Sequence, residues 1–348
     1  MAPRLRTLSD FTLADLEGIR VLLRGGSVVD WHRINFAEEQ EARAFVAAHE
    51  IDLDDARDAA RVNQIKKQAI EYLRRNFDFP VPKPVARRDV VGLLMLASSK
   101  GHRQICACAI LKVMHIIHHL EARELMFLLP VADEEVFHLV EHKVYQVMGA
   151  ALANDFPILE FIGGRKNKDS LYTKLLSKPD VSAAQIYDKV RFRIVTRTAA
   201  DVFPVLNFLQ RSVVPFNFII PGQSTNTLLR FHQHCSEDAT LSELVSKLQL
   251  PLDLEDGLSS LDNRFTAPSY RVVHFAADVP VRVPQRILEA APPATEGLGE
   301  VIFVQAEFQV IDRASDQTNE SGDASHASYK ERQKLAVMHR LKVGRFSK

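Results

Sequence analysis

The sequence predicts an α+β protein in which a helical N-terminal region is followed by a β-sheet core flanked by helices. Two observations predict this class. In the first third of the chain, apolar residues recur at helical spacing, most clearly in residues 55–75 and 104–129. Farther on, apolar and polar residues alternate in residues 186–197 and 301–312, which is the period of a strand with two different faces.

Length and composition allow full hydrophobic cores, because the chain has 348 residues of which 46% are hydrophobic. Forty-four basic residues balance 44 acidic ones, so the chain has no net charge that would favour binding to nucleic acid or to a membrane surface. The three cysteines, Cys106, Cys108 and Cys235, fit a reducing cytoplasm. The N-terminus lacks an apolar signal region, and no stretch of membrane-spanning length is free of charge. We therefore expect a cytoplasmic protein without a membrane span.

Helices are expected over the first third of the chain. One begins at Leu13, a second covers residues 55–75 and a third covers residues 104–129. A fourth amphipathic helix is predicted for residues 133–153. Residues 1–132 are interpreted as a helical accessory region.

Two histidine patterns in these helices raise the question of zinc. His115 and His119 are four residues apart, so one helix face presents both imidazoles, either as metal ligands or as a packed pair in a helical bundle. His138, Glu141 and His142 fit the H-x-x-E-H pattern of inverted zinc peptidases, although short patterns of common residues also arise by chance. A zinc peptidase is therefore one alternative function.

The stretch at residues 186–197 carries an acid at its start and arginines along one face. Asp188 precedes an alternation of apolar residues (Val190, Phe192, Ile194) with basic ones (Arg191, Arg193, Arg197). This arrangement suits a site for metal-bound polyphosphate. The acid would bind the divalent cation, and the arginines would bind phosphate oxygens. The other interpretation is an edge strand with a solvated basic face.

The second strand, Val301–Asp312, has one continuous apolar face, formed by Ile302, Val304, Ala306, Phe308 and Val310. Its other face carries Glu307 between Gln305 and Gln309, an unusual place for a charge. The simplest use of Glu307 is as a second metal ligand, or as a base, opposite Asp188.

Between these strands and around them we expect further elements. Residues 156–162 read as a strand followed by a glycine turn and a helix with lysines, an arrangement that binds phosphate or forms a solvated basic loop. A helix (200–210) and a strand (214–221) come next, then an insertion at about residues 223–262 with a helix at 241–250.

The last part of the chain returns to strand at residues 270–283. Residues 313–328 have the polar composition of a disordered segment. Residues 329–348 form a basic helix, either with a solvated face or with a surface for RNA or an acidic partner.

Taken together, the second half of the chain resembles the synthetase domain of the RelA/SpoT family of guanosine alarmone synthetases. The family's D-x-x-x-x-R-I strand is matched by Asp188, Arg193 and Ile194, and its E-x-Q-I strand by Glu307, Gln309 and Val310. The most specific match is to A-E-x-G-x-A-A-H-x-x-Y-K, by Glu320, Gly322, Ala324, His326, Tyr329 and Lys330. The phosphate-gripping R-x-K-x-x-x-S-x-x-x-K segment is matched, one residue short, by Arg165, Lys166, Lys168, Ser170 and Lys174. Tyr270 and His274 keep the spacing of the Y-x-S-x-H element.

The resemblance runs from about Phe137 to the C-terminus and implies a mixed-sheet, nucleotidyltransferase-like core over residues 133–348. It implies Mg²⁺-dependent transfer of pyrophosphate from ATP, the donor, to the 3′-hydroxyl of GDP, GTP, another nucleotide or an RNA 3′ end. Asp188 and Glu307 would hold Mg²⁺, with Glu307 also the candidate base, and Tyr270 would stack on the acceptor base. The implied ATP-phosphate ligands are Arg165, Lys166 or Lys168, Lys174 and Arg193, while His326 and Lys330 would shape the floor of the site.

The chain departs from the family pattern at three places. Ile311 stands where the E-x-Q-I-R-T arginine would be, Asn217 replaces an acid of the D-Y-I-x-x-P element, and Pro268 and Ser269 replace an Asn-Gly pair before Tyr270. An alternative is therefore a decayed synthetase fold that binds nucleotide or regulates another protein. The sequence carries no signal for an oligomeric state.

Overall fold

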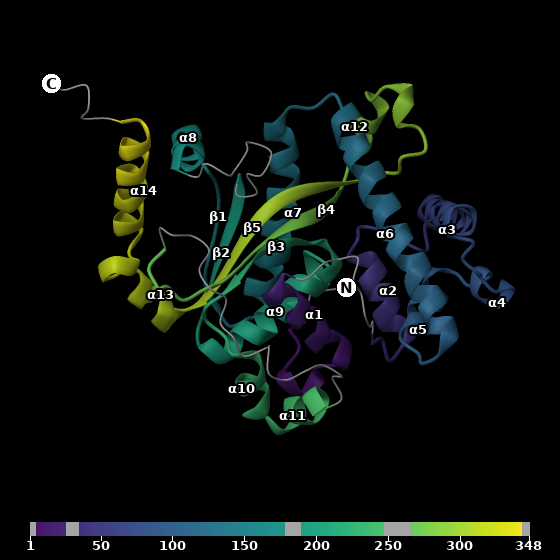
Figure 1. The fold of residues 1–348 in the computed structure, drawn as a ribbon, viewed down its shortest axis with the longest axis horizontal. Coiled ribbons are helices and arrows are strands. Elements are labelled where there is room, and N and C mark those ends of the chain that lie inside the picture. The colour runs from purple at the N-terminus through teal and green to yellow at the C-terminus, as the bar shows by residue number, and fades with distance from the viewer. Residues whose placement is uncertain (1–4, 26–34, 178–188, 247–265, 343–348) are drawn as a thin grey trace.

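The computed structural model describes residues 5–25, 35–177, 189–246 and 266–342, and its centre is a five-stranded mixed sheet (Figure 1). The strand order is β1-β2-β5-β4-β3. The pair β2–β5 is parallel and the other three pairs are antiparallel. The strands are β1 (Ile158–Arg165), β2 (Val190–Thr196), β3 (Ile219–Asn226), β4 (Val273–Arg282) and β5 (Val301–Asp312). The α+β class and the mixed sheet are thus confirmed.

Helices precede the sheet in sequence, lie between its strands and follow its last strand. The α-helices are α1 (Leu13–Arg24), α2 (Glu39–Ala47), α3 (Ala56–Phe77), α4 (Lys83–Ala86), α5 (Val90–Ala97), α6 (His102–Leu128), α7 (Asp133–Ala153), α8 (Lys168–Ser177), α9 (Val202–Ser212), α10 (Phe231–Ser236), α11 (Ala239–Ser246), α12 (Gln285–Glu289), α13 (Arg313–Asn319) and α14 (His326–Arg340). Short 3-10 helices are η1 (Leu8–Asp10), η3 (Ala199–Asp201), η4 (Phe216–Phe218), η6 (Pro293–Thr295) and η7 (Gly322–Ala324).

The apolar face of the sheet forms as the alternation predicts. The even-numbered residues of β5 from Ile302 to Val310 are at most 3% exposed. Phe308 packs against Phe192 of β2 and Phe275 of β4, with ring centroids 5.3 and 5.2 Å apart. Helix α7, which lies behind the sheet in Figure 1, covers this face.

The described residues form two hydrophobic clusters. One joins the sheet to α7, α9, the C-terminal half of α6 and also α1, although α1 lies in the accessory region. The other holds together α2, α3, α5 and the N-terminal half of α6, so α6 takes part in both. Among the described helices, α6 is the one long and apolar enough to cross a bilayer by length and composition, and here it packs against α3, α5 and β5.

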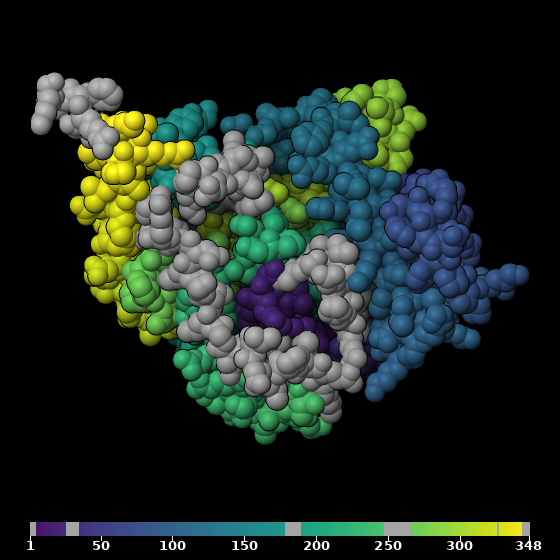
Figure 2. Space-filling view, in the orientation of Figure 1, coloured from purple at the N-terminus to yellow at the C-terminus, as the bar shows by residue number. Residues whose placement is uncertain are grey.

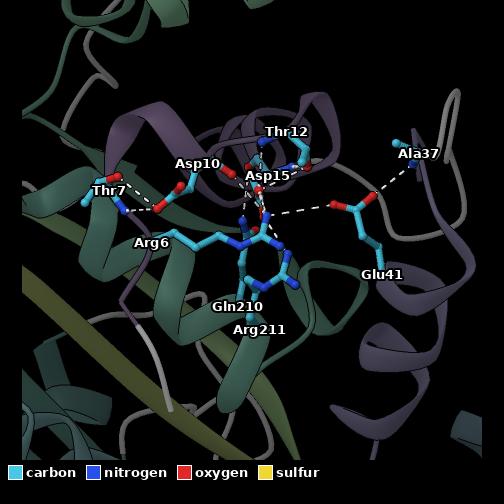
Figure 3. A network of polar contacts seen from close by, with 9 residues as sticks. All are labelled: Arg6, Thr7, Asp10, Thr12, Asp15, Ala37, Glu41, Gln210 and Arg211. Atoms are coloured by element: carbon cyan, nitrogen blue, oxygen red, sulfur yellow. Dashed lines mark hydrogen bonds and ion pairs between the residues drawn. The ribbon is translucent and has the colours of Figure 1, made fainter. Parts of the chain in front are cut away.

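A buried carboxylate anchors α1 to α9. Asp15 has a side chain only 2% exposed, and it forms ion pairs with Arg6 at 2.7 Å and Arg211 at 2.9 Å (Figure 3). It also accepts hydrogen bonds from the backbone and hydroxyl of Thr12, which caps α1. The Gln210 amide donates to the backbone oxygen of Asp15 at 3.0 Å. These contacts fix the start of the chain against the sheet domain.

Four local expectations were wrong. Strand β1 runs through Gly163 and Gly164 to Arg165 without a turn, and glycine at 163 is needed because a Cβ there would collide with the Tyr145 hydroxyl of α7. The strand expected at 214–221 begins at Ile219, after η4. The strand expected from Tyr270 begins at Val273.

The fourth correction concerns the polar run 313–328, whose composition predicts disorder. It forms α13, η7 and the first turn of α14. The Asp312 carboxylate starts α13 by accepting the N–H groups of Ala314 and Ser315, at 3.0 and 3.1 Å. Buried Asn319 ends α13 and ties it to the chain before β4. Capping and one buried amide therefore supply the order that apolar composition does not.

Candidate active site

The sheet has one polar face, which the β-strand period places opposite the apolar one. In register, Glu307 of β5 lies between Arg191 of β2 and Ala276 of β4, and Gln309 lies between Arg193 and His274. Helix α6 borders this face at one end, where His119 Nε2 lies 2.9 Å from Asp278 Oδ2. In Figure 2 the yellow-green strand atoms are visible at the floor of a hollow between α8 and α14 on one side and α6 and α7 on the other.

Glu307 is the centre of the polar face. Its Oε1 accepts a hydrogen bond from Gln309 Nε2 at 2.6 Å and lies 3.4 Å from His274 Nε2. Burial alone would raise the pKa of Glu307, but His274, the charge of Lys166 and the Gln309 amide outweigh it and lower the pKa to about 2. The carboxylate is therefore an anion at neutral pH. Such a weak proton acceptor suits a metal ligand better than a general base.

Both arginines expected to grip phosphate are paired with carboxylates. Arg165, at the end of β1, donates from Nε and Nη2 to the two oxygens of Glu141 on α7, each at 2.7 Å. This bidentate pair raises the pKa of Arg165. Arg193 of β2 forms an ion pair with Asp316 of α13. Each arginine is thus held in one orientation, and its role toward ATP stays a prediction.

The lysines expected to bind phosphate lie beside β1 and along α8. Lys166 follows β1 directly and is close enough to Glu307 for its charge to lower that carboxyl's pKa. In α8, Lys168 is exposed, Lys174 is half-buried, and the Ser170 N–H donates to the Asn167 side chain at 2.8 Å. Lys166 thus joins the Glu307 group.

Tyr270 lies near the same group from the other side. Burial raises the pKa of Tyr270, Arg193 acts to lower it, and Glu307 and Tyr329 act to raise it, so the hydroxyl of Tyr270 lies within electrostatic reach of all three. Lys330, next along α14, is exposed, and His326 is the first residue of that helix. The structure brings together Tyr270, His274, Glu307, Gln309, Arg193 and Lys166.

Asp188 lies outside the described residues, so the predicted pair of metal ligands is described only at Glu307. Within the described part of the chain, the contacts of the Glu307 carboxylate with His274 and Gln309 are made through Oε1. Glu307 Oε2 takes part in neither of these two contacts. An ionised oxygen ligand on a basic face fits Mg²⁺ bound to polyphosphate.

The histidine patterns do not assemble a metal centre among the described residues, where no group of three or more His, Cys, Asp or Glu side chains converges. Glu141 is occupied by Arg165, and the His138 side chain is 74% exposed. His115 faces the Asn217 amide at 3.2 Å, while His119 turns to Asp278. The predicted peptidase site therefore has neither a free glutamate nor convergent ligands.

The sequence matches no family model and no curated protein. Its structural neighbours are small alarmone synthetases. Small alarmone synthetase 1 of Bacillus subtilis is 14% identical, with 59% of this chain and 86% of that chain covered and a TM-score of 0.30. Small alarmone synthetase 2 of the same organism is 15% identical, with 60% and 92% covered and a TM-score of 0.30. A GTP pyrophosphokinase family protein of Streptococcus pneumoniae is 13% identical, with 60% and 88% covered and again a TM-score of 0.30. At these scores the likeness bears no functional argument.

Sequence patterns missed three residues that shape this face. Asp316 pairs with Arg193. Asn319 and Thr227 are buried, at 3% and 4% exposure, and bond Arg271 and Val272 respectively. The first two lie in the run whose composition predicts disorder. A capping Asp312 before them was the available signal, because an Asp followed by small polar residues begins helices.

Proposed function

We propose that this protein is a nucleotide pyrophosphokinase of alarmone type, built on a nucleotidyltransferase-like sheet. The observation that carries the proposal is the ionised Glu307 at the centre of a basic face, with Lys166 beside it and Tyr270 near it. An ionised carboxylate beside cations suits a bridging divalent metal, and an aromatic ring nearby suits a nucleobase. The motifs at residues 165–174 and 320–330 point to the same chemistry.

In this reaction the acceptor 3′ oxygen attacks the β-phosphorus of ATP. The bond from that phosphorus to the oxygen bridging to the α-phosphorus breaks, AMP leaves with the electron pair of that bond, and the proton of the hydroxyl passes to solvent water. Charge spread over the phosphate oxygens must be neutralised by positioned cations. Glu307, with Asp188, would hold Mg²⁺, which supplies that neutralisation when bound. Lys166 would act on the same phosphates, together with Lys168 or Lys174.

Tyr270 would bind the acceptor base by stacking, which is tolerant of base identity. GDP, GTP, another nucleotide and an RNA 3′ end are therefore all included as acceptors. The described cysteines are free thiols, which suits the cytoplasm, where we place this activity.

The test is transfer of label from γ-labelled ATP with Mg²⁺ to a panel of GDP, GTP, ATP and tRNA. Wild type is compared with Glu307→Gln, which keeps the shape of the side chain and removes its charge, and with Asp188→Ala. The matched control is Asp278→Asn, a carboxylate of the same sheet face that is engaged by His119. We expect label transfer by wild type and by the Asp278→Asn control, and none by Glu307→Gln. No transfer to any acceptor by wild type would refute the proposal.

A second candidate, a nucleotide-binding or regulatory protein without transferase activity, is favoured by the two occupied arginines. Arg165 and Arg193 are both neutralised by carboxylates of this chain, Glu141 and Asp316. Nucleotide binding measured by calorimetry without label transfer would select this candidate. Recovery of transfer in Asp316→Asn would show that the ion pair restrains a site otherwise able to react.

A further inference from the structure

The chain segment Tyr270–Arg271–Val272 continues the line of β4 beyond Val273, where its strand pairing with β3 and β5 ends. The ladder stops at Val273, which pairs with Val310 of β5 and Asn226 of β3. By the antiparallel register, the next partner on the β5 side would be Asp312 facing Arg271. Asp312 instead caps α13, so β5 turns away. Backbone N–H and C=O groups that lose a strand partner must find another when buried.

The Asn319 side chain on one side, and the hydroxyl and backbone N–H of Thr227 on the other, bond this segment where strand pairing has ended. On the β5 side, the Asn319 oxygen accepts the Arg271 N–H at 3.0 Å and its amide donates to the Arg271 carbonyl at 2.7 Å. On the β3 side, the Thr227 hydroxyl accepts the Val272 N–H at 3.0 Å, and the Thr227 N–H donates to the Val272 carbonyl at 2.9 Å. A carboxamide is the side chain that reproduces both bonds of a strand neighbour, because it carries a donor and an acceptor together.

These bonds act on the residues directly after Tyr270. Tyr270 is also held by its own N–H, which donates to the Ala267 carbonyl at 3.0 Å. With the backbone fixed on both sides, the ring stays near Glu307 and Arg193 and need not be ordered when a ligand arrives. Pre-organisation of this kind raises affinity by lowering the entropy lost on binding.

We propose that Asn319 and Thr227 are positioning residues that hold Tyr270 as a ready-made platform for the acceptor base. This rests on the proposed function, in which Tyr270 stacks on that base. Neither residue touches the reacting atoms, so they affect acceptor binding and leave ATP binding and the chemical step unchanged.

The experiment measures two properties of each variant. The first is amide hydrogen exchange at residues 270–272, which needs no assumption about activity. The second is steady-state label transfer, with KM for GTP and for ATP and kcat obtained separately. Variants are Asn319→Ala, Asn319→Asp, Thr227→Val and Thr227→Ser. The control is Asn154→Ala, which removes an exposed amide that donates to the Ala150 carbonyl at the end of α7.

In Asn319→Ala we expect exchange at Arg271 to be about tenfold faster or more, because two hydrogen bonds are lost. The GTP KM should rise about five- to tenfold through the loosened ring, with kcat and the ATP KM unchanged. Asn319→Asp keeps the acceptor and loses the donor, so its effects should be smaller. Thr227→Val loses the hydroxyl bond to the Val272 N–H but keeps the backbone bond to the Val272 carbonyl, so exchange should be faster at Val272, by less than at Arg271 in Asn319→Ala. Thr227→Ser, which keeps the hydroxyl, should behave like wild type.

Unchanged exchange and unchanged GTP KM in both Asn319→Ala and Thr227→Val would overturn the proposal while wild-type activity stands. An equal rise of the GTP and ATP KM values would also overturn it, because that is the signature of general loosening. If wild type neither transfers label nor binds GTP, the proposed function is refuted. The proposed role of Asn319 and Thr227 in binding the acceptor base is then refuted with it. Faster exchange in the variants would then show only that the two side chains hold the backbone.

Discussion

Two buried histidines should make the stability of this protein depend steeply on pH between 6.5 and 5. His49 of the segment after α2 and His115 of α6 are each 8% exposed, and both rings face the side-chain amide of Asn217, at 3.0 and 3.2 Å. Because that amide donates, each facing ring nitrogen is an acceptor and both imidazoles are neutral. Burial, with the nearby charge of Lys143, lowers the pKa of His49 to about 4. Burial, with the neighbouring histidines, lowers the pKa of His115 to about 3.

The sign follows from proton binding. The unfolded chain takes up a proton at each histidine near pH 6.5, whereas the folded chain does so only near pH 4 or 3, so acid favours the unfolded state. The contribution of these two histidines to the free energy of unfolding is fully present above pH 6.5 and is lost as the pH falls below that value. Between pH 7 and pH 5 each histidine should lower the free energy of unfolding by about 2 kcal/mol, and the two together by about 4 kcal/mol.

Urea unfolding followed by far-UV circular dichroism at several values from pH 7 to pH 5 measures this directly. Replacing either residue, as His49→Gln or His115→Gln, should flatten the dependence by about 1.4 kcal/mol per pH unit, the value for one proton. His138→Gln, at a side chain that is 74% exposed, is the control for the substitution itself. A wild-type slope near zero in this range, or an unchanged slope in His115→Gln, would refute the reasoning.

Four other outcomes are expected. Glu307→Gln should remove several kcal/mol of transition-state stabilisation and so slow label transfer, whereas Asp278→Asn should transfer label like wild type. Kinetic assays of both variants measure this. Tyr270→Ala should raise the acceptor KM roughly tenfold or more and Tyr270→Phe should not, because the ring does the stacking; equal KM values in both would remove the ring from the site. Metal analysis should find no stoichiometric zinc. His138→Ala should lower the free energy of unfolding by at most about 1 kcal/mol, because the side chain is exposed. Asp15→Asn should lower the free energy of unfolding by about 1–3 kcal/mol in urea, since the half-buried Arg6 and Arg211 lose their carboxylate.

The elements that sequence reasoning placed well are those in which one strong periodic signal determines the structure. Strand β5 and helix α7 have the predicted bounds, because the first alternates without interruption and the second is amphipathic throughout. The grouping of Glu307, Gln309 and His274 follows from strand period and register, once the two strands are known to pair. Pairing partners, however, are not contained in either strand alone.

The parts that were not predicted depend on single contacts between segments distant in sequence. The sequence predicts a turn at Gly163, yet this residue lies within β1. Glycine is required there because a Cβ would collide with the Tyr145 hydroxyl of α7. Arg165 reads as a phosphate ligand, and its bond to Glu141 joins two elements whose packing no local pattern reveals. Asn319 lies in a run too polar to predict order, and its burial depends on the turn of β5 into α13.

The parallel pairing of β2 with β5 has a consequence for how this chain is made. Val190 pairs with Ala306, more than a hundred residues later, so the centre of the sheet is completed only when β5 has left the ribosome. Until then a nascent chain has β1 and β2 but no neighbour for the far edge of β2, whose Val190, Phe192 and Ile194 are fully buried in the finished protein. An open apolar edge of this kind recruits other strands. Synthesis of this protein should therefore depend on chaperones that hold the chain until β5 arrives, and stalled chains that end before residue 301 should aggregate.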